Sequence, residues 1–236
     1  MSHFISTATS DDIAARESSV AVLPVGSFEQ HGDILPLATD TMVASLIAHR
    51  ISADYRLFLL PPVTMSCSFE HAGFPGTVAV SAGTVTALIT DIRSSLSAQG
   101  VDTLAIVNGH GGNYFLSNVV VEANAARPGS MTLFPTREDW EKARADSDCI
   151  SSHSEDMHAG ELEVSLLLHA DPGLVREGYK QSDHLAGPRP FLLIRGMKGY
   201  TDTGVIGRPS QGTPEKGQAI LDSLSQSFAA HLQLLS

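Results

Sequence analysis

The segment SVAVLPVGSFEQHGDILPLATD, residues 19–40, joins an apolar run to a polar loop. The run at 19–25 is apolar on both faces, as strands buried in a parallel sheet are. The loop that follows carries Glu29, His31 and Asp40, whose side chains are common ligands of divalent metal ions. These residues are therefore candidate ligands at the end of a buried strand. An ordinary solvated loop is the alternative, and this stretch alone is compatible with both.

The rest of the chain alternates short apolar runs with longer amphipathic stretches. Runs with strand character are RLFLLPPV (56–63), DTLAIVNG (102–109) and SMTLFPT (130–136). Stretches with apolar residues at helical spacing are 40–53, 83–99 and 113–127, and a last helix is expected at 216–235. This order predicts an α/β fold in which helices cover both faces of a parallel sheet built through right-handed crossovers. We expect Asp40 or Thr41 to cap the first of these helices and Asn113 the third.

Composition narrows the class of protein and its partners. With 236 residues, 42% of them apolar and 17% charged, the chain has enough aliphatic side chains for one domain spanning 1–236. The net charge of −11 argues against nucleic acid or an anionic membrane as partner, because both attract basic surfaces. The two cysteines form no disulfide framework, and neither a signal peptide nor a membrane-spanning apolar run is visible. We therefore expect a soluble cytoplasmic protein.

A second polar loop follows another predicted strand. NGHGGN (108–113) comes directly after DTLAIV and places His110 among glycines. Because ligands bind at the carboxyl edge of parallel sheets, both polar loops should meet at one edge. Glycines let the backbone turn tightly and approach a ligand closely. A phosphate-binding loop is the competing interpretation, but the segment has neither a Walker lysine nor GxGxxG spacing.

A third cluster, SEDMHAGELEVSLLLH (154–169), contains His158, Glu161 and Glu163. If a helix begins near Gly160, Glu163 lies on its apolar face. An ionised carboxylate there is unfavourable unless it is paired or binds a metal, so Glu163 is the better ligand candidate and Glu161 the second. Two acids that complement the dipole of a helix N-terminus are the alternative.

Together the clusters supply five candidate metal ligands: Glu29, His31, Asp40, His110 and Glu163. Mixed carboxylate and imidazole ligands suit zinc, manganese or iron, and the lack of a thiolate cluster argues against a structural zinc site. Five ligands exceed the need of one tetrahedral ion and predict two divalent ions about 3.5 Å apart. Asp40, near the start of a helix, is the candidate bridge between them.

These motifs resemble those of the creatininase (creatinine amidohydrolase) family. The likeness lies in LPVGSFEQHGDILPLATDT (23–41), FPGTVAVS (74–81), NGHGGN (108–113) and HAGELEVSLLL (158–168). It implies a three-layer α/β/α sandwich, hydrolysis of an amide-type C–N bond by a metal-bound hydroxide at a dinuclear site, and a homo-oligomer, commonly a hexamer. It also implies metal binding by Glu29, His31, Asp40 and His110, and it matches His158 to the family's histidine before the E-x-S element.

For the reaction, we expect His158 to protonate the leaving nitrogen, because imidazole titrates near neutrality. Glu161 is the next candidate for this role. Gly111 and Gly112 are expected to leave space for the substrate and to offer backbone N–H groups to the developing oxyanion. Candidates to line the pocket are Phe69, His71 and Phe74.

Departures from creatininase itself bear on the substrate. Creatininase has NGHYEN, whose glutamate is a metal ligand, where this chain has Gly112, so another acid, expected in the HAGELE segment, must supply the oxygen. Creatininase also encloses its flat substrate with tryptophans, whereas Trp140 lies outside the motifs, so creatinine is not the expected substrate. The stretch YTDTGVIGRPSQGTPEKGQAIL (200–221) is more similar to the mycofactocin-precursor peptidase branch, which removes a dipeptide from a peptide C-terminus.

The expected substrate is therefore a small-molecule amide or a short peptide. Two alternatives stay open. One is a deformylase or cyclic-amide hydrolase that acts on a small metabolite. The other is a non-catalytic family member that the metal stabilises.

Overall fold

Four parallel strands form the centre of the computed structural model, which describes residues 5–15 and 19–235. The strands are β1 (Val20–Val25), β2 (Phe58–Leu59), β3 (Thr103–Asn108) and β4 (Met131–Phe134), in the order β2-β1-β3-β4. β1 and β3 pair along their whole length, and Val25 lies opposite Asn108 at the carboxyl end. The loops after these two strands therefore leave the sheet side by side, as the sequence predicted.

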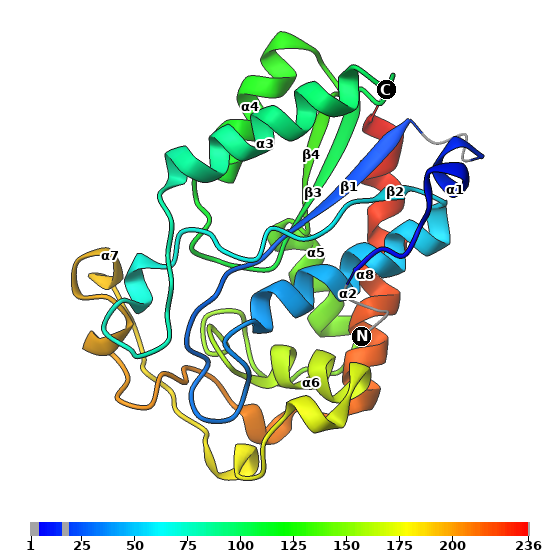
Figure 1. Ribbon diagram of the computed structural model, residues 1–236. Coiled ribbons are helices and arrows are strands. Elements are labelled where there is room, and N and C mark those ends of the chain that lie inside the picture. The colour runs from blue at the N-terminus through cyan, green and yellow to red at the C-terminus, as the bar shows by residue number, and fades with distance from the viewer. Residues whose placement is uncertain (1–4, 16–18, 236) are drawn as a thin grey trace.

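Helices cover both faces of this sheet (Figure 1). One face carries α3 (Ala82–Ser97) and α4 (Leu116–Ala126). The other face carries the layer of α2 (Thr39–Tyr55), α5 (Arg137–Asp146), α6 (Glu161–Ala170) and α8 (Pro214–Leu234). Alternate residues of β1 divide between the two layers, with Val22 in one apolar cluster and Leu23 in the other. The predicted three-layer α/β class is confirmed, because strands that are apolar on both faces need cover on each.

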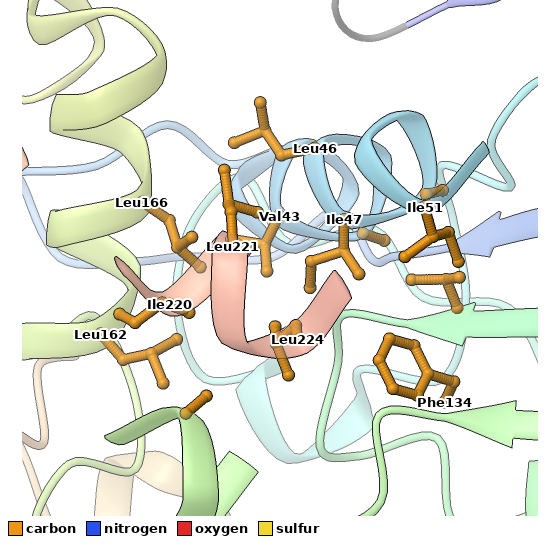
Figure 2. Packing of buried hydrophobic residues seen from close by; sticks show 14 of the residues in the cluster. Val43, Leu46, Ile47, Ile51, Phe134, Leu162, Leu166, Ile220, Leu221 and Leu224 are labelled. Carbon is orange, nitrogen blue, oxygen red and sulfur yellow. The ribbon is translucent and has the colours of Figure 1, made fainter. Parts of the chain in front are cut away.

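The larger apolar cluster lies between the sheet and the layer of α2, α6 and α8. Figure 2 shows Val43 of α2, Leu166 of α6 and Leu224 of α8 gathered there, with Phe134 at the end of β4. All four side chains are at most 2% exposed, and burial of each stabilises the fold by about 1.5–3 kcal/mol. This packing fixes the position of the first turn of α6, which carries Glu163, relative to the sheet.

The second strand is shorter than the predicted run at 56–63. It is limited to Phe58–Leu59 because Pro61 and Pro62 have no N–H to donate to a neighbouring strand. An isolated bridge between Val25 and Val63 continues the pairing beyond these prolines. The segment after β2 therefore runs alongside the end of β1.

Helix α5 is absent from the sequence prediction. Its sequence, REDWEKARAD, is mostly charged and therefore lacks a clear apolar period. A capping box begins the helix, in which Thr136 accepts from the N–H of Asp139 and the Asp139 carboxylate accepts from the N–H of Thr136. The signal for this helix was in its cap and not in its apolar pattern.

The caps predicted for α2 and α4 are wrong. α2 begins one residue before Asp40, and its N-cap, Ala38, makes no side-chain hydrogen bond. α4 begins at Leu116, and the Asn113 side chain instead donates to Oδ1 of Asn108. The side chain of Asp40 therefore does not cap the helix and is buried in the fold.

The remaining elements are short. They include α1 (Ser10–Ala14), α7 (Leu192–Arg195) and the 3-10 turn η1 (Phe69–His71), which precedes α3. The last helix extends over Pro214–Leu234, close to the predicted range. Within residues 5–15 and 19–235, every helix is too short or too polar to cross a membrane.

Candidate metal centre

Polar side chains converge at the carboxyl edge of β1 and β3. Glu29 and His31 lie on the loop after β1, Asp40 in the first turn of α2, and His110 on the loop after β3. Each of these four residues is at most 4% exposed. Glu163, in the first turn of α6, reaches the same place from the helical layer. The structure thus brings together all five side chains that the sequence singles out as candidate ligands.

Glycines at the two strand ends allow this convergence. Gly26 follows β1 and Gly109 follows β3, and a Cβ atom on either would overlap the backbone of Thr41 or Asp40. The first turn of α2 can therefore rest directly on both strand ends. Ser27 Oγ donates a 2.6 Å hydrogen bond to Oδ2 of Asp40 and holds the carboxylate between the two loops.

A first group of candidate ligands consists of Glu29, Asp40 and His110. His110 Nδ1 lies 2.9 Å from Asp40 Oδ2 and 3.2 Å from Glu29 Oε1. Atoms that share an ion at about 2.0–2.2 Å are separated by about 3–3.5 Å. The spacing of this group therefore suits one divalent ion.

A second group consists of His31, Asp40 and Glu163. His31 Nε2 lies 3.0 Å from Asp40 Oδ1 and 3.7 Å from Glu163 Oε1. The other Glu163 oxygen accepts a 2.6 Å hydrogen bond from the N–H of Ala159, which orients the carboxylate. Asp40 belongs to both groups and turns one oxygen toward the histidine of each.

Backbone carbonyls define which nitrogen of each histidine carries the proton. A carbonyl oxygen only accepts, so His31 Nδ1, 3.0 Å from the Glu29 carbonyl, is an N–H donor. His110 Nε2, 2.8 Å from the Cys67 carbonyl, is a donor for the same reason. In the neutral rings, the lone pairs therefore lie on the nitrogens that face carboxylates. Such pairs repel unless a proton or a metal cation lies between them.

The pKa values of Glu29, His31, Asp40 and His110 reflect burial and their mutual charges. Burial raises the pKa of Glu29 to about 7, and the charge of Asp40 adds to this rise. Burial alone would lower the pKa of His31 and of His110, yet the carboxylates around them raise both well above their usual value. Burial would raise the pKa of Asp40, but the two histidines hold it well below its usual range. Positive charge is therefore favoured between these side chains.

The Glu29 carboxylate shows most directly that the site fits a metal cation. It is fully buried, and neither oxygen accepts a hydrogen bond from the residues that the structure describes. A buried polar group without a partner costs about 1–3 kcal/mol, and more when it is charged. Bound divalent ions would satisfy these oxygens, and the mixed carboxylate and imidazole donors suit zinc, manganese or iron.

His158 lies against both groups. Its ring centroid is 4.1 Å from that of His31, and its Nδ1 is 3.8 Å from Glu29 Oε1. Nε2 lies 2.6 Å from the Gln30 carbonyl, so Nε2 carries the ring proton. Burial, followed by the charge of His31, lowers the pKa of His158 to about 4. At neutral pH the ring therefore presents the lone pair of Nδ1 to the site.

Glu161 does not join these groups. Its buried carboxylate lies 2.5 Å from Lys216 Nζ and accepts hydrogen bonds from the N–H groups of Ile150 and Ser151. These partners occupy its lone pairs, so the catalytic role that the sequence suggested for Glu161 does not fit its placement. The carboxylate instead ties α8 to the loop that leads to His158.

Two residues of η1 also reach the site, although the sequence did not single them out as ligands or catalytic groups. His71, expected only to line a pocket, has its Nε2 3.3 Å from Glu29 Oε1. Glu70, which belongs to none of the sequence motifs, has its Oε1 3.5 Å from His110 Nε2. Phe69, in contrast, is 60% exposed. The sequence could have indicated both residues, because an acid and a histidine stand next to each other after a predicted strand.

A cavity of about 270 Å³ opens beside the two groups. His110 and Glu163 form part of its wall, and Trp140 of α5 forms another part. Trp140 lies outside the sequence motifs, but the fold brings it to the site. The expectation of free space beside Gly112 is wrong, because the Glu70 carboxylate occupies the position that a side chain there would take.

Comparisons with known proteins give this site a context. The family model described as Creatininase, creatinine amidohydrolase, matches residues 6–232. The mycofactocin precursor peptide peptidase of Mycolicibacterium smegmatis is 31% identical over 97% of this chain and 90% of its own length. The creatinine amidohydrolase of Pseudomonas putida is 27% identical over 39% of this chain and 37% of its own length. A solved structure of a manganese form of creatininase, 22% identical, has a TM-score of 0.81 over 99% of this chain and 98% of its own.

The family match includes every segment that contributes a candidate ligand. The solved structure shows that the fold is shared over nearly the whole chain. The protein therefore belongs to the creatininase family and is an amidohydrolase, an enzyme that acts on C–N bonds.

Proposed function

We propose that this amidohydrolase is a metal-dependent peptidase of the mycofactocin-precursor type, which cleaves an amide bond near the C-terminus of a short peptide. The observation that carries the metal dependence is the sharing of Asp40 between two ligand groups, each with its own histidine. Two divalent ions would be held there, one by Glu29, Asp40 and His110 and the other by His31, Asp40 and Glu163. The manganese form of the similar creatininase structure supports this choice of cofactor.

When bound, the ions would lower the pKa of a water molecule toward about 7 and polarise the carbonyl group of the substrate. The protein itself would handle the proton. Nδ1 of His158 faces the site with a lone pair and can take the proton that the attacking water loses. The same nitrogen would then deliver this proton to the leaving amine, which completes hydrolysis of the C–N bond.

The substrate class rests on the extent of the similarity. The mycobacterial peptidase matches nearly the whole chain, whereas the creatinine amidohydrolase matches 39% of it. In the cavity wall, Trp140 is accompanied by Arg137 and His153 from the surrounding loops and helices, and the chain has no second tryptophan. A pocket of this kind suits a peptide with polar groups better than a small flat ring enclosed by aromatic side chains.

The test is hydrolysis of defined substrates followed by mass spectrometry. The purified protein, loaded in turn with Zn²⁺, Mn²⁺ or Fe²⁺, is incubated with the mycofactocin precursor peptide and with a scrambled peptide of equal length. We expect loss of a C-terminal dipeptide from the first peptide only, abolished by a chelator and restored by added metal. The Asp40→Asn variant is the matched control, because it keeps the shape of the side chain and removes its charge.

Other outcomes would contradict this proposal. Release of formate from a formylamino compound, with both peptides intact, would make the protein a deformylase. Loss of the fold or of subunit assembly on chelation, with no turnover of any amide, would identify a structural metal site.

A further inference from the structure

The NGHGGN motif suggests open space beside Gly112, but in the fold other side chains occupy this space. A Cβ atom at this position would overlap both Glu70 Oε1 and His110 Nε2. The backbone of Gly112 has no positive φ, so glycine is not required there for its conformation. Glycine suits this position because the carboxylate of Glu70 and the ring of His110 already fill the space.

Glu70 reaches this space from η1, 42 residues earlier in the chain. Its side chain is 16% exposed, and Oε1 lies 3.5 Å from His110 Nε2. The backbone of Glu70 is confined from behind, because its carbonyl oxygen lies 2.8 Å from the position that a Cβ on Gly196 would take. Gly196 has a φ of 62°, which disfavours any other residue at this contact. The fold therefore fixes the backbone of Glu70 at a place from which its carboxylate reaches His110.

The same nitrogen of His110 also donates to the Cys67 carbonyl at 2.8 Å. Nε2 thus faces a carbonyl oxygen and a carboxylate, and both favour a proton on this nitrogen. Histidines that bind metals commonly donate their other ring N–H to such groups, which fix the tautomer and the ring orientation. With the proton on Nε2, the Nδ1 lone pair is directed at Glu29 and Asp40.

We propose that Glu70 is a positioning residue for the metal ligand His110. The lack of a side chain at Gly112 leaves room for the Glu70 carboxylate. Together with the Cys67 carbonyl, the Glu70 carboxylate holds the His110 proton on Nε2 and keeps Nδ1 available to a cation. This inference rests on the metal site of the proposed function.

The test is a cycle of four proteins: the native chain, Glu70→Ala, Gly112→Ala and the double variant. Zn²⁺ affinity is measured by competition with a chromophoric chelator, and thermal unfolding of the metal-depleted proteins checks the fold. We expect Glu70→Ala to weaken Zn²⁺ binding roughly 10- to 100-fold, as is typical for outer-sphere partners. Gly112→Ala should weaken binding at least as much, because the added methyl group displaces the carboxylate and also meets the His110 ring.

The double variant separates this inference from a general disturbance of the loop. Because Gly112→Ala already displaces the Glu70 carboxylate, removing Glu70 as well should add little, and the double variant should bind Zn²⁺ about as well as Gly112→Ala alone. Glu70→Gln, which fills the space and keeps an acceptor oxygen, should recover part of the affinity. Asp91→Asn, which removes an exposed charge from α3, is the matched control and should bind as the native chain does.

Three results would overturn the inference. They are native Zn²⁺ affinity in Glu70→Ala, additive losses in the double variant, and loss of a whole ion in Glu70→Ala, which would make Glu70 a ligand. The first two leave the proposed function intact as long as the native chain binds metal and cleaves its peptide. If the native chain bound no metal, the proposed function would fail first.

Discussion

Nε2 of His158 lies 2.6 Å from the carbonyl oxygen of Gln30, so the backbone of the loop after β1 selects the nitrogen that His158 turns toward the site. Gln30 stands between the candidate ligands Glu29 and His31. One three-residue segment therefore supplies two candidate ligands and the acceptor that orients His158. The His158 ring and the candidate ligands are thus fixed relative to one another, which proton transfer to and from a substrate bound beside them requires.

Removal of the His158 ring should separate proton transfer from metal binding. His158→Ala is expected to retain both ions and to lose roughly 10²- to 10⁴-fold in kcat, the usual contribution of general acid–base catalysis. The loss should be smaller for an activated anilide, whose leaving group needs little protonation. Metal analysis and kcat on both substrates measure this. If the variant lost metal in proportion to its activity, Nδ1 of His158 would be a ligand, as its grouping with Glu29 and His31 permits.

Asp40 turns one oxygen toward the histidine of each group. Asp40→Ala should therefore reduce the metal content from close to two ions per chain to near zero, while Glu163→Ala should lose one. Elemental analysis of the purified variants, with circular dichroism to check the fold, gives the answer. Retention of one ion by Asp40→Ala would show that Asp40 does not bridge.

Metal affinity should depend on pH through Glu29. Burial and the charge of Asp40 raise the pKa of this carboxyl to about 7, so it is protonated below that pH in the protein without metal. A bound cation must displace the proton, and the raised pKa values of His31 and His110 act in the same direction. Mn²⁺ affinity should therefore fall by at least about tenfold for each pH unit below 7, because at least one proton is released. Competition titrations between pH 6 and 8 measure this slope, and a flat profile would contradict the prediction.

Lys216 should matter for stability and not for metal binding. Lys216→Met leaves the fully buried Glu161 carboxylate without its ion-pair partner and should lower the free energy of unfolding by about 3 kcal/mol. Burial opposes ionisation, but Lys216 and the N–H groups of Ser151 and Ile150 lower the pKa of Glu161 below its ordinary value of 4.5. The stabilisation should thus be complete above pH 4.5 and lost as the pH falls through the lowered pKa.

Urea unfolding and metal analysis at pH 7 test the role of this pair. Glu161→Gln keeps the shape of the side chain and should change kcat by less than a factor of a few. A loss of kcat as large as that of His158→Ala, at unchanged stability, would return Glu161 to the catalytic groups.

Much of this protein could be read from local sequence. The strand at 19–25 and the loop after it were predictable because apolar β-branched runs form buried parallel strands, and ligands gather where such strands end. The helix at Glu161–Ala170 was expected from its apolar face and its start at Gly160. In contrast, α5 was missed because its charged sequence has no apolar period. The caps assigned to Asp40 and Asn113 were wrong because Asp40 lies inside α2 and pairs with His31, while Asn113 binds Asn108 within its own loop.

The choice between Glu161 and Glu163 illustrates what sequence patterns can and cannot decide. Helical spacing favoured Glu163 as the ligand, and the structure places its carboxylate at His31. No local pattern could assign Glu161 to Lys216, because that pair depends on how α6 packs against α8 across 55 residues of chain.

The fold class and the five side chains that meet at the sheet edge could be predicted from the sequence, because strand burial, helix period and ligand chemistry are local properties. The family could be identified because its motifs are short stretches of sequence. Tertiary structure alone decided how the rings of His158 and His110 are oriented and what occupies the space beside Gly112. Gln30 turns the ring of His158, the Cys67 carbonyl sets the tautomer of His110, and Glu70 fills the space beside Gly112. Each of these contacts joins segments that are distant in the chain, and a contact of that kind leaves no periodic signal in either segment.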